Sequence, residues 1–233
     1  MTLAFLVPFG AAAPLRLSAQ VGIHAAAIPL ATRAWHTPGD RTLTEIAVVQ
    51  PAVMLEWESP MDMEGTRPWS FGLRATLNGE GLTIPDGELA PGDHGEGYYD
   101  RRHPHTYVHE VVASARYCGW WSGDCRLQFG VTAGKGFAAF GTDDPMSRPA
   151  VRYPVNHHLA QILERAIVIG SLRWRGLAIE RSGFNGDEPT RPRDWPNWDR
   201  GLDSRAWRFS ARPLPGLEAQ YSVARVKSPE HRP

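Results

Sequence analysis

The sequence predicts an all-β protein, an antiparallel β-barrel of about eight strands, and three observations lead to this prediction. Turn-forming residues are abundant, with 23 Gly and 20 Pro in 233 residues, and nine Trp add to the aromatic residues that suit strands. Apolar and polar residues alternate within segments of about ten residues. Short and long connections separate these segments, which is the layout of outer-membrane barrels.

Eight segments are predicted to be strands: 42–57, 68–78, 105–118, 125–134, 164–174, 176–184, 204–213 and 217–227. The alternation is clearest in 126–133, where Leu127, Phe129 and Val131 share one face and polar residues share the other. Segment 217–224 alternates in the same way. In 156–165, apolar spacing favours a helical turn, and we expect it to precede a strand that begins near Glu164.

The alternation fits two structures. One is a transmembrane barrel with an apolar outer face and a polar lumen, and the other is a soluble antiparallel sheet with one solvated face. The asymmetry of the connections favours the first, because residues 79–104, 135–163 and 185–203 are long and polar whereas 174–176 and 213–216 are tight. Aromatic residues near strand ends would form a girdle: Trp69, Tyr107, Tyr117, Trp120, Trp121, Trp174 and Trp207.

The charge and the N-terminal segment bear on partners and location. A formal net charge of +0 argues against nucleic acid as a partner. Residues 1–40 are expected to be a signal-like or disordered segment, and 41–233 the barrel domain. We therefore expect a bacterial outer-membrane protein in contact with lipid, with a periplasmic or secreted protein as the alternative.

Cys118 and Cys125 bracket a turn-rich insert, so they are either a disulfide across a hairpin or two unrelated thiols.

The stretch YYDRRHPHTYVHE (98–110) contains three histidines of one parity, which an extended chain places on one face. Imidazole nitrogens bind zinc and copper, and further ligands would have to come from other loops. The residues considered as metal ligands are His103, His105, His109, His157 and His158. The alternative is a polar strand mouth in which the histidines hydrogen-bond with Asp100 and Arg102.

Other motifs give little support for catalysis. The sequence has no G-x-S-x-G element, and 133–145 lacks the spacing of a phosphate loop or a dinucleotide fingerprint, so an enzyme is not expected and no cofactor beyond zinc or copper is considered. Asp143 and Asp144 form an acidic pair that could help to bind a metal ion or another ligand. Trp195 and Trp198 are candidates for stacking against a small solute.

Several blocks of this chain resemble uncharacterised bacterial outer-membrane, porin-like β-barrel proteins. They are YYDRRHPHTYVHEVVASARY (98–117), GKGFAAFGTDDPM (134–146), RPAVRYPVNHHLAQILERAIVIG (148–170) and FNGDEPTRP (184–192). The FGTDDPM part is also similar to a porin strand-to-loop transition. The resemblance implies a barrel in the outer membrane and no assigned reaction or substrate.

One feature departs from that group. Outer-membrane barrels usually end on a strand with a terminal aromatic residue, whereas this chain ends in SPEHRP (228–233), so a fragment of a larger barrel is a further expectation. A closed barrel of about eight strands would have a lumen filled by side chains, and binding would fall to its loops. A larger barrel would pass small solutes along lumen residues, for which the candidates are Arg126, Gln128, Glu180, Arg208 and Arg212. The sequence specifies neither the solute nor the oligomeric state.

Overall fold

The computed structural model describes residues 18–33, 42–60, 68–79, 82, 106–119, 125–141, 164–187, 189 and 191–227; for residues 18, 24–33 and 42–50 it describes the backbone. Within these residues the chain is all-β and forms one antiparallel sheet of nine strands. The strands are β1 (Ser18–Arg33), β2 (Thr42–Glu58), β3 (Trp69–Asn78), β4 (Val108–Cys118), β5 (Leu127–Gly136), β6 (Arg165–Trp174), β7 (Leu177–Phe184), β8 (Ser204–Leu214) and β9 (Leu217–Arg225).

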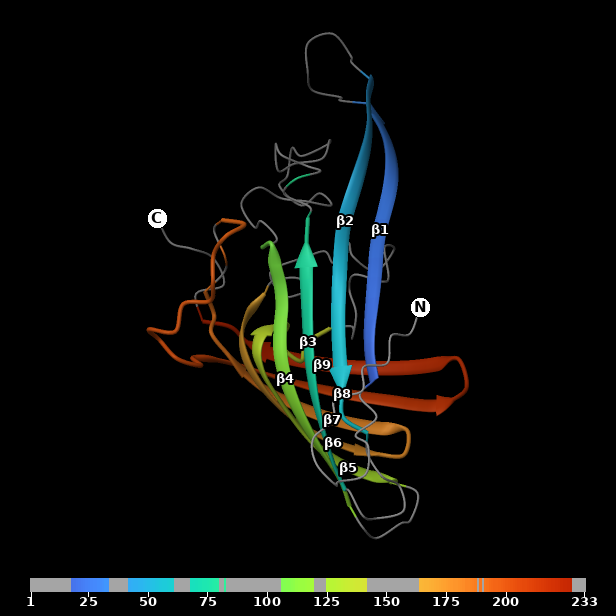
Figure 1. Cartoon of the computed structure of the whole chain (residues 1–233), viewed down its shortest axis with the longest axis vertical. Helices are drawn as coiled ribbons and strands as arrows, with labels where there is room; N and C mark the ends of the chain where they lie inside the picture. Colours follow the sequence, from blue (N-terminus) through green and yellow to red (C-terminus); the bar gives the residue numbers. More distant parts are fainter. Residues whose placement is uncertain are drawn as a thin grey trace, which may run out of the picture.

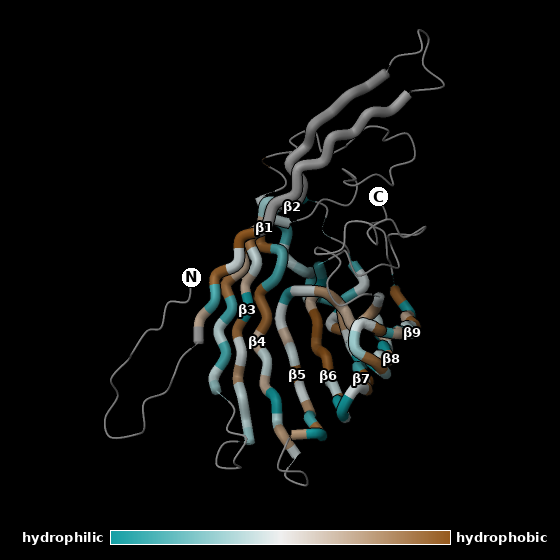
Figure 2. The backbone as a smooth tube through the Cα atoms, turned by 90° about the vertical axis from the view of Figure 1, so that its right-hand side faces the viewer, coloured by the Kyte–Doolittle hydropathy of each residue, from teal (hydrophilic) through white to brown (hydrophobic). Residues whose placement is uncertain are grey.

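Each strand pairs with its neighbours in the sequence, so the order in the sheet is β1 to β9 without a crossover. The sheet twists and curls, and β1–β4 run lengthwise in Figure 1 while β8 and β9 run across that direction behind them. Figure 2 shows the same curl from the side. In the described residues the sheet is not closed into a barrel, and β1 and β9 are its two edges.

All eight predicted strands form. The largest difference in their boundaries is in β4, which was predicted to begin at residue 105 and begins at Val108. Strand β1 was not predicted; it lies inside the segment 1–40 that was expected to be signal-like or disordered, and it pairs with β2 along its length. The sheet therefore has nine strands in the described residues, where about eight were expected.

The two ends of the sheet differ in their connections. At one end, called here the turn end, two-residue turns at 175–176 and 215–216 join β6 to β7 and β8 to β9. Arg175 and Gly216 have positive φ values of 53° and 79°, which are typical of tight hairpin turns. The other end, called here the loop end, has the long connections that follow β3, β5 and β7.

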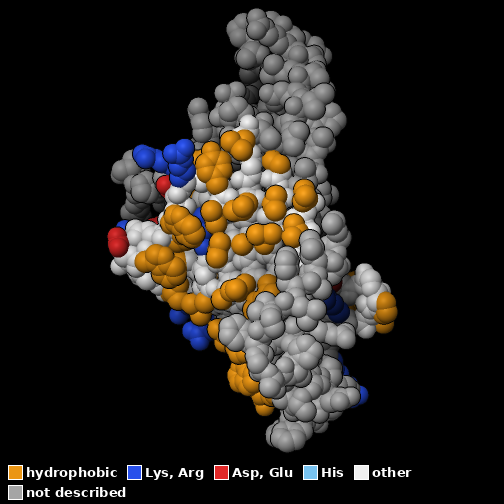
Figure 3. All heavy atoms as spheres, viewed as in Figure 1, with side chains coloured by type: hydrophobic (Ala, Val, Ile, Leu, Met, Phe, Trp, Pro, Cys, Tyr) orange, Lys and Arg blue, Asp and Glu red, His pale blue; other side chains and the backbone are white. Residues whose placement is uncertain are grey.

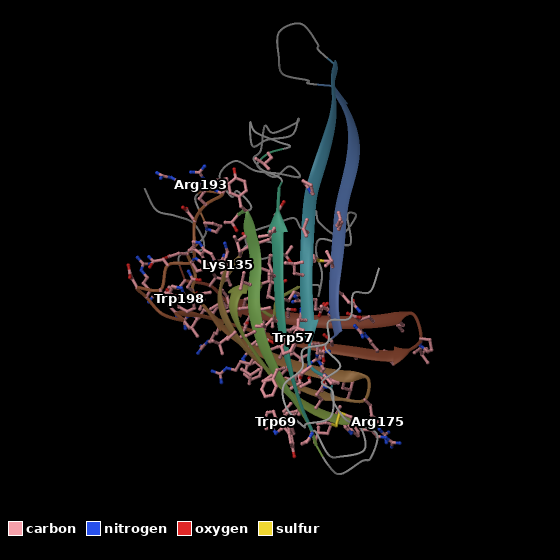
Figure 4. The ribbon with its side chains drawn as sticks, viewed as in Figure 1. Trp57, Trp69, Lys135, Arg175, Arg193 and Trp198 are labelled. Carbon is pink, nitrogen blue, oxygen red and sulfur yellow. A yellow bond between two sulfur atoms is a disulfide. The ribbon has the colours of Figure 1, made fainter. Side chains whose placement is uncertain are left out.

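A disulfide between Cys118 and Cys125 closes the β4–β5 connection at the turn end, so the hairpin interpretation of these cysteines is confirmed. The pair joins the last residue of β4 to a residue just before β5, with the two Cα atoms 5.3 Å apart. The disulfide appears in yellow near the turn end in Figure 4. It holds the two strands in register where they leave the sheet.

The two faces of the sheet have opposite chemistry. The convex face, called here the outer face, carries apolar side chains that are exposed on every strand whose side chains are described. The strand register aligns them in rows, one of which runs Trp69, Tyr117, Phe129, Leu172, Ile179, Phe209 and Tyr221. Figure 3 shows these apolar side chains spread over the face of the sheet turned to the viewer. The predicted division into an apolar and a polar face is thus present.

The concave face, called here the inner face, carries polar and charged side chains. Glu180 and Arg208 are buried there as an ion pair at 2.6 Å, with Arg173 Nη2 3.7 Å from the same carboxylate. Arg116 pairs with Glu58, and Arg74 pairs with Glu110 at 2.6 Å. In the described part of the chain, no helix is long and apolar enough to cross a membrane.

Candidate functional site

The loop end of the inner face is covered by the chain that follows β5. The backbone N–H of Ala139 donates to Ser182 Oγ of β7 at 3.2 Å, and the N–H of Gly141 donates to Ser222 Oγ of β9 at 3.1 Å. Because β5 and β9 are four strands apart in the sheet, segment 137–141 must cross the inner face to make both bonds. We call residues 137–141 the crossing segment.

The crossing segment packs on a small apolar cluster, in an otherwise polar face. The buried members of the cluster are Val112, Ala138, Ile167, Phe184 and Ala206, and Phe140, Ile169, Ala224 and Val226 pack against them partly buried. Two of these residues, Ala138 and Phe140, belong to the crossing segment itself. Burial of this apolar surface therefore fastens the segment inside the curl of the sheet.

Gly134 sets the direction in which the chain enters the inner face. Its φ is +144°, and a Cβ atom built on it would lie 2.2 Å from the carbonyl oxygen of Val111. Val131 and Ala133 of the same strand point outward and are exposed, and continued alternation would point Lys135 outward too. Lys135 is instead buried, because the unusual backbone at Gly134 breaks the alternation.

The Lys135 ammonium is held by groups from two distant parts of the chain. Nζ donates to Thr106 Oγ1 at 2.7 Å and to the backbone carbonyl of Asp194 at 3.2 Å. It also lies 5.1 Å from the ring centroid of Trp195, a cation–π distance. Figure 4 shows Lys135 toward the loop end, on the same side of the molecule as Arg193 and Trp198 of the β7–β8 connection.

A buried histidine–carboxylate pair lies next to this lysine. His109 Nδ1 is 2.8 Å from Glu164 Oε1, and the two side chains are 1% and 0% exposed. The backbone N–H of Thr106 donates to the same oxygen at 3.0 Å. Thr106, His109, Lys135 and Glu164, called here the buried polar cluster, thus join β4, β5 and the start of β6 at the loop end.

The β7–β8 connection is fastened to the same region. Arg165 Nη1 donates to the carbonyl oxygens of Asn185 at 3.4 Å and Asp187 at 3.2 Å, and also to that of Gly186. A side chain at Gly186 would collide with the backbone carbonyl of Lys227, which lies 1.7 Å from an ideal Cβ. This close approach requires glycine and holds the connection against the chain that follows β9.

This arrangement is suited to holding loops in place over the inner face. Side chains of the buried polar cluster bond to one another and to backbone groups, and all four are buried. Arg173, an exposed charge of the inner face, lies farther toward the turn end, next to the last residue of β6.

The predicted site residues are only partly within the described chain. His109 is engaged with Glu164, Trp195 lies by Lys135, and Trp198 is exposed. The remaining candidates lie outside the described residues: Asp100, Arg102, His103, His105, Asp143, Asp144, His157 and His158. Among the residues that the structure describes, no group of three or more side chains is arranged to hold a metal ion.

Of the predicted lumen residues, Glu180 and Arg208 are buried on the inner face, and Gln128 is half-buried on the same face. Arg126 and Arg212 lie exposed at the turn end, where Arg212 Nε donates to Glu218 Oε2 at 2.8 Å.

Sequence reasoning missed Thr106, Lys135 and Glu164 as parts of a site. A lysine between two glycines at a strand end was the available signal, and it was considered only as a failed phosphate loop. Comparison of the chain with protein-family models, curated proteins and solved structures found no match.

Proposed function

We propose that this chain forms the wall of a porin-like β-barrel in a bacterial outer membrane. The exposed apolar outer face, which extends over the described strands, carries the proposal. A water-soluble protein rarely exposes a contiguous apolar patch larger than a few hundred Å². In lipid, the same surface is the one that lowers the free energy of insertion.

The height of the apolar face agrees with this proposal. On β3 the outward side chains run from Trp69 to Leu77, which are eight residues apart. At about 3.3 Å per residue the face is about 26 Å long, and a tilt of about 40° reduces its height to about 20 Å. Outer-membrane barrels have an apolar band of about 25 Å.

Aromatic side chains lie at the turn-end edge of this face. Near the turn end, Trp69 packs on Tyr117 with ring centroids 4.8 Å apart, and Trp174 lies beside Arg175. Figure 4 shows Trp69 and Arg175 together at that end. Amphipathic aromatic rings are favoured where lipid meets water, so these residues support a girdle at the turn end.

The inner face supports the porin-like part of the proposal. Its paired charges, such as Glu180 with Arg208, suit a wet lumen through which small polar solutes pass. The crossing segment and the fastened β7–β8 connection lie over this face at the loop end. We propose that they restrict the size of the solutes that pass, once the barrel is closed by pairing of its edges.

A soluble secreted β-barrel that binds a small ligand or a metal ion is the second candidate. It requires the apolar strand faces to point into the interior. The exposed apolar side chains of the outer face and the paired charges of the inner face favour the membrane barrel over this candidate.

The test is electrophoretic mobility after expression behind a competent signal sequence. A folded barrel recovered from the outer-membrane fraction should migrate differently before and after boiling. A chain that is soluble in the periplasm and shows no shift would refute the proposal and favour the secreted, ligand-binding alternative. If the shift is observed, passage is measured next: vesicles that contain the refolded protein should swell in solutions of small sugars.

A further inference from the structure

The outer face has only one kind of charged residue among the described strand side chains. Arg181, Arg205 and Arg225 point outward and are exposed, while the other outward positions are apolar side chains or glycine. All three arginines lie on adjacent strands, β7, β8 and β9. Arg205 is the second residue of β8 and Arg225 is the last residue of β9, so both lie at the loop end.

The register brings two of these charges directly together. Arg205 and Arg225 are Cα partners in the β8–β9 ladder, so their Cβ atoms are about 5 Å apart on the same face. Arg181 is paired with Trp207, the next outward residue of β8, and its guanidinium lies 5.3 Å from that indole ring. Like charges opposite each other in a sheet are destabilising unless an anion lies between them.

The described residues around these arginines do not neutralise them. Among the described residues, no carboxylate forms an ion pair with Arg181, Arg205 or Arg225. The nearest acidic residue along β8 is Asp203, and its Oδ1 accepts from the N–H of Gly186 and the hydroxyl of Ser204 at 2.9 Å each. Within the described part of the chain, the pair of guanidinium groups is therefore available to an external anion.

Below Arg205 and Arg225, toward the turn end, the outer face of β8 and β9 is apolar. Trp207 and Val223 form the next outward pair, followed by Phe209 and Tyr221. A ligand on this surface would place a negatively charged group on the arginines and an apolar chain along the aromatic residues. Guanidinium groups bind phosphate through two parallel hydrogen bonds, which suits two arginines on one phosphate.

We infer that Arg205 and Arg225, with Arg181 beside them, bind the head group of a phosphorylated, anionic membrane lipid at the loop end of the outer face. This inference rests on the proposed membrane location. It also accounts for the position of Arg205 and Arg225, because arginine on a lipid-facing strand is tolerated near the interface and costly at the midplane. These two arginines would mark where the head groups begin, and Arg181 lies level with Trp207, one outward pair nearer the turn end.

The experiment uses the full chain refolded in a non-ionic detergent, with lipid binding followed by native mass spectrometry. Phosphatidylglycerol and phosphatidylcholine are the probes, since they differ in net charge with similar acyl chains. We expect phosphatidylglycerol to bind about tenfold more tightly than phosphatidylcholine. Equal binding of the two lipids by the wild-type chain would overturn the inference.

Variants locate the site. R205Q/R225Q should lose about tenfold in affinity for phosphatidylglycerol, while R175Q/R212Q, which removes two exposed arginines from the turn end, should keep it. R205K/R225K keeps both charges and loses the paired guanidinium hydrogen bonds, so it should retain only part of the affinity, and its comparison with the wild type isolates the guanidinium contribution even if the glutamine variant does not fold. Unchanged binding by R205Q/R225Q, or an equal loss in R175Q/R212Q, would refute the assignment.

Two controls separate the remaining explanations. Inorganic phosphate that displaces phosphatidylglycerol as effectively as added lipid would identify a free-anion site and overturn the lipid assignment. The shift on boiling is measured on the same preparation: a shift without lipid preference refutes this inference alone, whereas a soluble chain without a shift refutes both it and the proposed function.

Discussion

An arginine placed at the middle of the outer face should destabilise the protein far more than one placed at its edge. Val131 lies mid-strand in β5 and is 54% exposed, and Leu217 begins β9 at the turn end and is 52% exposed. In water the two positions are equivalent, and arginine at an exposed site changes stability by about 0.5 kcal/mol or less. In lipid, arginine costs about 2–4 kcal/mol at the midplane and about 0–1 kcal/mol near the interface.

The depth of Val131 follows from the strand geometry. It lies four residues beyond Leu127, the first residue of β5 at the turn end. At about 3.3 Å per residue and a tilt of about 40°, this places it about 10 Å above that end, near the middle of a band about 20 Å high. V131R is therefore expected to lose about 2–4 kcal/mol, and L217R about 0–1 kcal/mol. Arg181 lies in the same register row as Val131 and is accommodated against the Trp207 ring, 5.3 Å from its guanidinium.

The assay is unfolding in guanidinium chloride of protein refolded into phospholipid vesicles, followed by tryptophan fluorescence. Both variants must first show the mobility shift on boiling, so that folded protein is compared. Equal and small losses in V131R and L217R would refute the membrane assignment of the outer face. A large loss in both would indicate that packing within the sheet, not depth in lipid, determines the cost.

Three further predictions follow from the inner face and the turn end. Gly134→Ala should destabilise the protein by about 2 kcal/mol or more, because its Cβ would lie 2.2 Å from Val111 O at a positive φ. Gly170→Ala is the control in the same unfolding assay: its Cβ would have no heavy atom within 4 Å, so stability should change by less than about 1 kcal/mol. Lys135→Met should make the β7–β8 connection more susceptible to trypsin at Arg193 and Arg200, since the bonds to Thr106 and the Asp194 carbonyl are lost. Lys227→Met, at an exposed position, is the control. Equal digestion of both variants would contradict the anchoring role of Lys135. Replacing Cys118 and Cys125 by serine should cost about 2 kcal/mol for this short loop, and a reductant should destabilise the wild type by a similar amount and leave the double variant unchanged.

The strands were predictable because the alternation of apolar and polar residues along each strand is a local property of the sequence. Leu127, Phe129 and Val131 alternate with polar residues, and they do share the outer face. Strand β1 was missed because Ser18–Arg33 contains a run of alanines and Pro29, which obscure the alternation and are unusual inside a strand. Alternation also left open which face is convex, because the direction of curl depends on the whole sheet.

The candidate site was much harder to predict. Thr106, Lys135 and Glu164 are about thirty residues apart in sequence, and the register of β4, β5 and β6 brings them together. Lys135 even reverses the alternation of its own strand, because of the backbone at Gly134. Local pattern could indicate that the histidine-rich stretch enters a strand, but it could not identify Glu164 as the partner of His109.

The uncrossed order of the sheet gives this chain a modular construction. Since every strand pairs with its sequence neighbours, the register of each hairpin is fixed by its pairing with the preceding strand. The same hairpin then fixes the register of the strand that follows it. Contacts of this kind span short loops, which keeps contact order low for an all-β protein and allows assembly to spread from one hairpin to the following one. Adding or deleting a whole hairpin would change the circumference of the wall and leave the pairing of the remaining strands intact. The crossing segment is the exception, because its bonds to β7 and β9 form only after those strands are in place, so the inner face is covered last.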